Sequence, residues 1–250
     1  MVMGRRASKQ AFPRRPWERE DVLIKRSVKY MFFKAVIFDL DGTLLNSLDD
    51  LGDSMNNMLE RHGYPVHSIE SYKYMIGDGA ALFVKRALPD SIKEADKIKE
   101  YLAEYRAEYK KNWRNKTRPY EGVVELIEEL HSHGIKLAVL SNKPHDSTEM
   151  CVREYLPFNK FDIILGHRPG KDLKPAPGGA FEIAEELNIS PYRILYLGDT
   201  SVDMKTAVAA GMHPVGVLWG FRDKDELMEN GAKKMIKKPA DLLEILKRSA

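Results

Sequence analysis

The stretch KAVIFDLDGTLLN, residues 34–46, joins a short apolar run to a pair of carboxylates. The run AVIF is too short for a helix and suits a buried parallel strand, at whose carboxyl end Asp39 and Asp41 follow. Gly42 and Thr43 then turn the chain, which leaves backbone N–H groups free to hold an anion. Read alone, an Asp-Gly turn with two solvated aspartates is the alternative. The stretch predicts a site in which one carboxylate attacks and its neighbour moves a proton.

Downstream of residue 119 the chain alternates between apolar runs and amphipathic segments. This alternation is typical of a doubly wound parallel sheet, which is an α/β fold. We expect strands at residues 135–141, 161–166, 194–199 and 214–220, and helices at 123–133, 146–155, 179–187 and 202–210, with two more around Leu227 and Leu242.

Between residues 46 and 118 the pattern is helical throughout. Apolar residues recur at helical spacing from Leu48 to Leu59, and the segments 70–88 and 92–113 are also predicted to be helical. An all-helical block is therefore inserted straight after the first strand. The predicted organisation is a basic, disordered extension at 1–30, an α/β core at 31–45 and 119–250, and a helical insert at 46–118.

Composition and charge exclude several classes of protein. Residues 1–30 hold nine Lys/Arg and three Asp/Glu; subtracting these from totals of 40 and 37 leaves 31 basic and 34 acidic side chains. The body is mildly acidic, so we expect no nucleic-acid partner. The single cysteine, Cys151, cannot form an intramolecular disulfide, and no apolar run is long enough to span a bilayer. We expect a cytoplasmic protein without a membrane partner.

Three further polar groups follow predicted strands. Ser141 and Asn142 end one strand, where a hydroxyl and backbone amides can hold a phosphate oxygen. Lys174 lies in a Lys-Pro pair before a helix and can offset negative charge on a phosphoryl group, whereas Lys171 is read as a solvated loop charge. Asp199 ends a strand and Asp203 lies four residues on, which suits a hard divalent cation. Taken singly, polar turns and a helix N-cap explain these groups equally well.

Together and in this order, the four motifs resemble those of the haloacid dehalogenase-like (HAD) phosphohydrolases. The resemblance covers most of the chain and implies a HAD-like Rossmannoid core with an inserted helical cap. It implies that Asp39 attacks phosphorus to give an aspartyl-phosphate, and that Asp41 protonates the leaving alkoxide and later deprotonates water. It further implies phosphate-binding Gly42, Thr43, Ser141, Asn142 and Lys174, and a Mg²⁺ site at Asp39, Asp199 and the Asp41 carbonyl, with Asp203 in support.

Within this family, the resemblance is greatest to phosphoglycolate phosphatases. It lies in residues 46–59, in the loop 75–88 and in the tetrapeptide SNKP at 141–144. Haloacid dehalogenases and phosphonoacetaldehyde hydrolases lack an aspartate in the place of Asp41 and are disfavoured. The insert would close over a small substrate, with Gly77 and Gly79 approaching the site and Lys85 and Arg86 meeting a substrate carboxylate. The alternative for these cap residues is an ordinary charged helix surface.

The predicted activity is Mg²⁺-dependent hydrolysis of a small phosphomonoester, 2-phosphoglycolate, by a monomer or homodimer. Two alternatives within the fold are a β-phosphoglucomutase-like phosphotransferase and a pyrophosphatase. An alternative of another class is a phospho-aspartate receiver module, in which Asp39 would be a regulatory acceptor. Asp41 and the large helical insert argue against the receiver.

Overall fold

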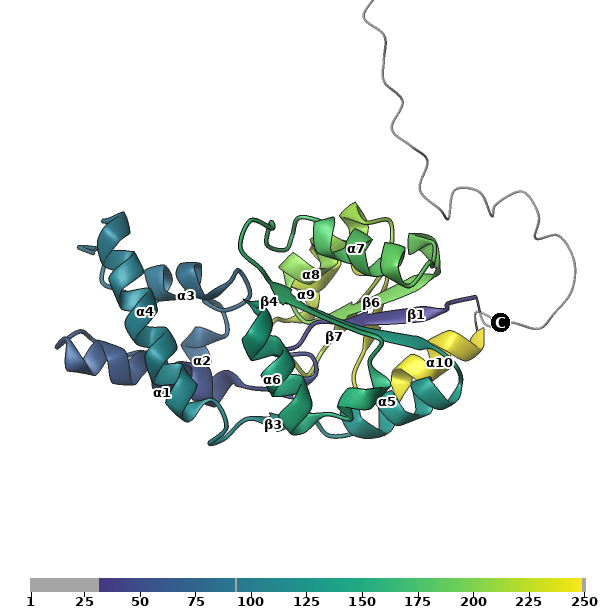
Figure 1. The fold of residues 1–250 in the computed structure, drawn as a ribbon, viewed down its shortest axis with the longest axis horizontal. Helices are drawn as coiled ribbons and strands as arrows, with labels where there is room; N and C mark the ends of the chain where they lie inside the picture. Colours follow the sequence, from purple (N-terminus) through teal and green to yellow (C-terminus); the bar gives the residue numbers. More distant parts are fainter. Residues whose placement is uncertain (1–31, 93, 249–250) are drawn as a thin grey trace, which may run out of the picture.

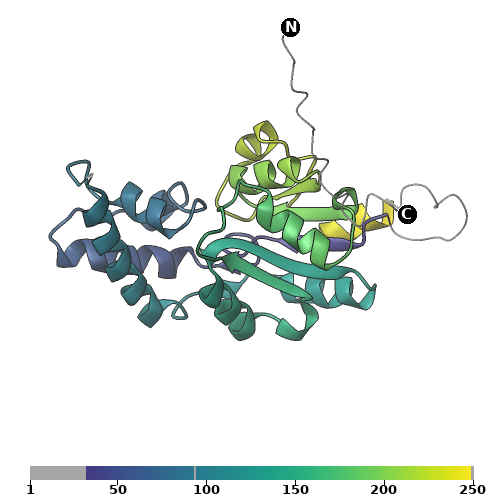
Figure 2. The same cartoon turned by 45° about the horizontal axis from the view of Figure 1, so that its top comes forward.

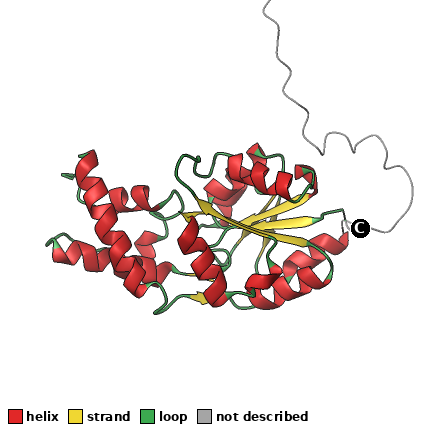
Figure 3. Cartoon of the chain, in the orientation of Figure 1, coloured by secondary structure: helices red, strands yellow, loops and turns green. Residues whose placement is uncertain are grey.

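The protein is built on a six-stranded parallel sheet (Figures 1 and 3). The computed structural model describes residues 32–92 and 94–248, so the predicted extension at 1–30 lies outside the described residues. The strand order is β5-β4-β1-β6-β7-β8. The strands are β1 (Ala35–Phe38), β4 (Lys136–Pro144), β5 (Ile163–His167), β6 (Ile194–Gly198), β7 (His213–Val217) and β8 (Lys234–Ile236).

The central position of β1 follows from its composition. All four residues are buried, because helices cover both faces of the sheet. Ala35 is in register with Lys136 on one side and with Ile194 on the other, and both pairings are parallel. The carboxyl ends of β1, β4 and β6 therefore meet at one edge, where ligands bind in open α/β sheets.

Helices lie on both faces of this sheet, as the alternation in the sequence predicts (Figure 1). One face carries α5 (Val123–Ser132), α6 (His145–Tyr155) and α10 (Asp241–Arg248), and the other carries α7 (Gly178–Glu186), α8 (Ser201–Ala209) and α9 (Lys224–Glu229). Val36 and Phe38 point into one buried cluster with residues of α5 and α10, whereas Ala35 and Ile37 point into a second cluster with residues of α7.

Four helices form a separate unit beside the carboxyl edge of the sheet (Figures 1 and 2). The predicted helix at 70–88 is wrong in its middle, because Gly77 and Gly79 take φ values of 122° and 90° that a helix does not allow. The chain forms a loop there instead. The helices are α1 (Leu48–Arg61), α2 (Ile69–Tyr72), α3 (Ala80–Ala87) and α4 (Ala95–Asn112).

The chain enters and leaves this helical unit at adjacent positions. Strand β2 (Leu45–Asn46) pairs with β3 (Arg118–Pro119) in an antiparallel arrangement. The buried carboxylate of Asp50, in the first turn of α1, stabilises the junction beside this strand pair. It accepts hydrogen bonds from the N–H groups of Lys116 at 2.9 Å and Thr117 at 2.8 Å.

Among the described residues, none of the helices has the length and apolarity needed to cross a membrane.

Candidate active site

Asp39 lies at the carboxyl end of β1, and its side chain is buried. Lys174 Nζ donates to Asp39 Oδ1 at 2.6 Å and to Asp203 Oδ1 at 2.7 Å. Lys174 Nζ also donates to the carbonyl of Leu140 at 3.0 Å, so all three ammonium protons have an acceptor. The lysine is therefore fixed between two carboxylates that lie far apart in the sequence.

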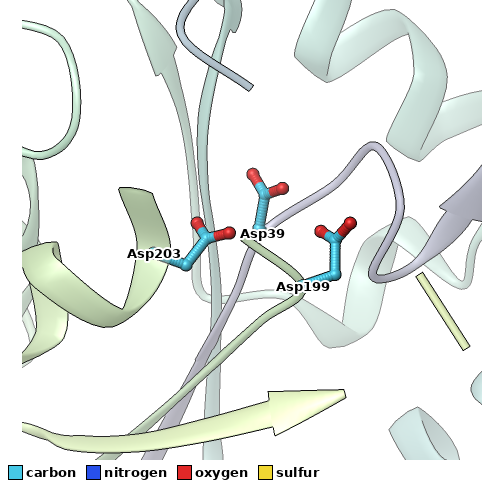
Figure 4. Close-up of side chains that lie close together, drawn as sticks. All are labelled: Asp39, Asp199 and Asp203. Carbon is cyan, nitrogen blue, oxygen red and sulfur yellow. The ribbon is translucent and has the colours of Figure 1, made fainter. Parts of the chain in front are cut away.

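Asp39, Asp199 and Asp203 form a compact cluster of carboxylates (Figure 4). Each offers one oxygen atom, and these atoms lie within 4.8 Å of one another. Asp199 accepts from the Thr43 hydroxyl at 3.0 Å and from the N–H of Phe221 at 2.8 Å, both neutral donors. Thr200 is the N-cap of α8 and forms a capping box with Asp203, whose Oδ2 accepts from the Thr200 hydroxyl at 2.7 Å. A cation between Asp39 and Asp199 would complete the charge balance.

The pKa values in the cluster show this imbalance. Burial raises the pKa of Asp39 to about 7, although Lys174 opposes the shift and Asp203 adds to it. Burial and the two neighbouring carboxylates raise the pKa of Asp199 well above its usual value. Burial alone would lower the pKa of Lys174, but Asp203 and Asp39 outweigh it and raise that pKa. Oxygen donors with this excess of negative charge suit a hard divalent cation.

Gly42 closes the turn that follows Asp39 and Asp41, and it lies directly over Asp199. Its φ is +91°, and a Cβ placed on it would lie 2.2 Å from Asp199 Oδ2. Only glycine fits both the backbone conformation and the space. Thr43, predicted to bind phosphate, has its hydroxyl on Asp199, so its side chain braces the carboxylate cluster.

Asp41 points away from the carboxylate cluster, toward β4. Ser47 donates to its Oδ1 at 2.6 Å, and Lys143 Nζ lies 3.0 Å from Oδ1 and 2.9 Å from Oδ2. Lys143 Nζ also lies 4.7 Å from the ring centre of Tyr109 on α4. Burial alone would lower the pKa of Lys143, but the Asp41 carboxylate and Tyr109 outweigh it and raise that pKa well above its usual value. Lys143 was not among the site residues predicted from the sequence, although its place in the tetrapeptide SNKP was a signal.

Asn142 joins three parts of the structure. Its side-chain NH₂ group donates to the carbonyls of Gly77 and Lys174, both at 3.0 Å, and its Oδ1 accepts from the N–H of Lys174 at 2.8 Å. Asn142 therefore positions the loop that carries Lys174 and ties it to the helical unit. The Ser141 hydroxyl accepts from the N–H of Lys143 at 3.2 Å.

A cavity of about 540 Å³ lies between the helical unit and the carboxyl edge of the sheet. Lys85 and Arg86 are exposed and are not among its lining residues; Arg86 pairs with Asp78 at 2.6 Å. Arg106 and Lys110 of α4 line the cavity instead, and neither was predicted from the sequence. Other lining residues are Asp39, Asp41, Gly77, Gly79, Phe83, Tyr105, Tyr109, Ser141, Asn142 and Lys143.

Known proteins resemble this chain both in sequence and in fold. A sequence model of the family described as "Haloacid dehalogenase-like hydrolase" matches residues 36–217. A phosphoglycolate phosphatase of Haemophilus influenzae (strain 86-028NP) is 31% identical over 220 residues, covering 86% of this chain and 98% of that protein. One from Pseudomonas putida is 30% identical over 191 residues, covering 75% of this chain and 70% of that protein. The crystal structure of a predicted phosphoglycolate phosphatase from Haemophilus somnus matches with a TM-score of 0.79 and 30% identity, covering 86% of this chain and 98% of that one.

Proposed function

This chain belongs to the haloacid dehalogenase-like hydrolases, and on that premise we propose that it hydrolyses 2-phosphoglycolate through an aspartyl-phosphate on Asp39. Its family and its phosphatase relatives identify the protein as a phosphatase. The substrate, the metal and the covalent intermediate are what we propose. The observation that carries the proposal is the placement of Asp39. Its carboxylate borders the cavity, 2.6 Å from Lys174 Nζ, with Asp41 two residues on.

In the first step, a carboxylate oxygen of Asp39 attacks phosphorus, and the bond between phosphorus and the ester oxygen breaks. Asp41 gives its proton to the departing alkoxide. In the second step, Asp41 takes a proton from water as that water attacks the phosphorus of the aspartyl-phosphate. The second phosphorus–oxygen bond then breaks, which releases inorganic phosphate and restores the Asp39 carboxylate.

The charge of Lys174 and the hydroxyl of Ser141 stabilise the phosphoryl oxygens during both steps. The Lys174 ammonium is fixed by Asp39 and Asp203, so it does not have to reorient as charge develops. The Ser141 hydroxyl borders the cavity and supplies a further donor. The N–H groups of Gly42 and Thr43, predicted to be free to hold an anion, instead donate to the carbonyls of Leu45 at 2.8 Å and Leu40 at 3.3 Å. Asn142 acts on this set indirectly, because it holds the backbone of Lys174.

The carboxylate cluster fits Mg²⁺. Asp39 and Asp199 would hold the ion, with the backbone carbonyl of Asp41, while Asp203 is engaged with Lys174 and Thr200. When bound, the cation neutralises charge on the carboxylates and on the phosphoryl group. Its presence also favours the ionised form of Asp39, whose pKa burial raises to about 7 without it.

The helical unit at 46–118 acts as a cap. Tyr105 and Phe83 from this unit border the cavity opposite Asp39. Closing these rings over a bound substrate excludes water from the first step, which protects the aspartyl-phosphate until the leaving group has departed.

The test is phosphate release with Mg²⁺ from 2-phosphoglycolate, β-glucose 1-phosphate, pyrophosphate and an aryl phosphate. We expect 2-phosphoglycolate to give the highest kcat/KM, and Asp39→Asn to lower turnover at least ~10³-fold. Asp225→Asn, at an exposed position of α9, is the matched control and should keep full activity. Substantial activity in Asp39→Asn with an unchanged circular dichroism spectrum would reject the nucleophile assignment.

A further inference from the structure

Lys143 is a buried ammonium group at the wall of the cavity. Its side chain is 6% exposed and forms an ion pair with Asp41, whose side chain is 14% exposed. The ring of Tyr109 from α4 lies against it at 4.7 Å. Removing an ammonium from water is costly, and Asp41 and the ring face offset that cost.

The position of Lys143 relative to the reaction follows from its contact with Asp41. As the proton donor, Asp41 must lie within hydrogen-bond reach of the ester oxygen of the substrate. Lys143 Nζ is 2.9 Å from Asp41 Oδ2, so it lies within two hydrogen-bond lengths, roughly 6 Å, of that oxygen. It stands on the leaving-group side, whereas Lys174 is bound to Asp39 on the phosphoryl side.

Building on the phosphatase function above, we propose that Lys143 binds a carboxylate of the leaving group that is one carbon away from the ester oxygen. The substrates selected in this way are 2-phosphooxy carboxylates, of which 2-phosphoglycolate is the simplest. In such a molecule a single carbon atom separates the ester oxygen from the carboxylate carbon. A leaving group hydrogen-bonded to Asp41 therefore brings its carboxylate to Lys143.

Other cations near the cavity fit this role less well. Arg106 and Lys110 line the cavity but are exposed, so water screens their charges. Lys85 and Arg86 are exposed and stand outside the lining. A buried ammonium discriminates a charged ligand from a neutral one far more strongly than an exposed ammonium does.

The experiment compares 2-phosphoglycolate with 2-hydroxyethyl phosphate, which has nearly the same shape and an uncharged end. In the wild-type protein we expect kcat/KM to favour 2-phosphoglycolate by at least about tenfold. Lys143→Met should lower that preference at least about tenfold, and Lys143→Arg should restore part of it. Lys99→Met, at an exposed position of α4, is the matched control and should retain the wild-type preference.

An equal loss of kcat/KM on both substrates in Lys143→Met would overturn the proposal, because it would leave Lys143 only the task of holding Asp41. Should this variant not fold, a series of substrates decides with the wild-type protein. 2-Phosphoglycolate should exceed 3-phosphooxypropionate and 4-phosphooxybutyrate, and a preference for a longer spacer would move the anion site to Arg106 and Lys110 and overturn the proposal. Phosphate release without any preference for a carboxylate sinks this inference alone. No release from any ester by the Mg²⁺-supplied wild type sinks the proposed function, and this inference with it.

Discussion

At the scale of single residues, Asp199 has the least compensated charge in the site. It is fully buried, and in the described part of the chain its hydrogen-bond donors are a hydroxyl and a backbone N–H. Lys174 is already shared between Asp39 and Asp203. A buried carboxylate that lacks a cationic partner raises the free energy of the folded state, and a bound cation removes that cost.

Asp199→Asn should therefore uncouple stability from Mg²⁺. In EDTA we expect the variant to unfold at a temperature no lower than wild type, because one of three mutually repelling carboxylates is gone. Mg²⁺ at a hundred times its Kd should stabilise wild type by about 2.7 kcal/mol and the variant much less. Thermal unfolding followed by circular dichroism measures both. An equal Mg²⁺ shift in the two proteins would exclude Asp199 as a ligand.

At the scale of elements, one turn of α1 holds the junction between the helical unit and the sheet. Asp50 is 1% exposed and accepts from the backbone of Lys116 and Thr117, the residues that lead into β3. Asp53, one turn further along α1, pairs with the Lys116 side chain at 2.7 Å on the surface. The two aspartates contact the same segment, but only one of them is desolvated.

Asp50→Ala should destabilise the protein by about 3 kcal/mol, because it leaves buried N–H groups without acceptors. Asp53→Ala, the matched control, should change the free energy of unfolding by no more than about 0.5 kcal/mol, since its ion pair is exposed. Urea unfolding of both variants measures the difference. Similar values for the two would contradict the assignment of the junction to Asp50.

The sequence predicts most of the sheet elements because parallel strands that are buried on both faces are almost continuously apolar. It does not reveal β8, β2 or β3, which have three or two residues and leave no periodicity to detect. The segment 70–88 carries helical spacing on both sides of Gly77 and Gly79, and their positive φ values became apparent only in the structure.

The site divides in the same way. Asp39, Asp199 and Asp203 follow predicted parallel strands, whose carboxyl ends share one edge, so their proximity was predictable. Lys174 was predicted from its Lys-Pro motif, and the structure places it beside Asp39. The contact between Lys143 and Tyr109 was not, because it depends on how α4 folds back against the sheet edge. No local pattern encodes that packing.

At the scale of the whole molecule, one buried cluster runs through both parts of the chain. It includes Met55 and Tyr105 of the helical unit and Phe38 and Val139 of the sheet. Because these side chains are desolvated together, we expect the two parts to unfold in one transition. Hydrogen exchange measured by mass spectrometry in rising denaturant should show α1 and β1 losing protection at the same concentration. Earlier loss in α1 would show that the helical unit unfolds independently.

The pairing of β2 with β3 has a consequence for how such a protein can diversify. Because Leu45 and Pro119 are paired neighbours, a short hairpin turn could connect β2 directly to β3 without any of the intervening residues. The helical unit is thus a contiguous insert that joins the rest of the chain at one place, the β2–β3 pair. Replacing it with a different insert would leave Asp39, Lys174 and Asp199 in place while changing the residues that the helical unit contributes to the cavity. Proteins that share this α/β core can in this way acquire new substrates by exchanging one contiguous stretch of gene.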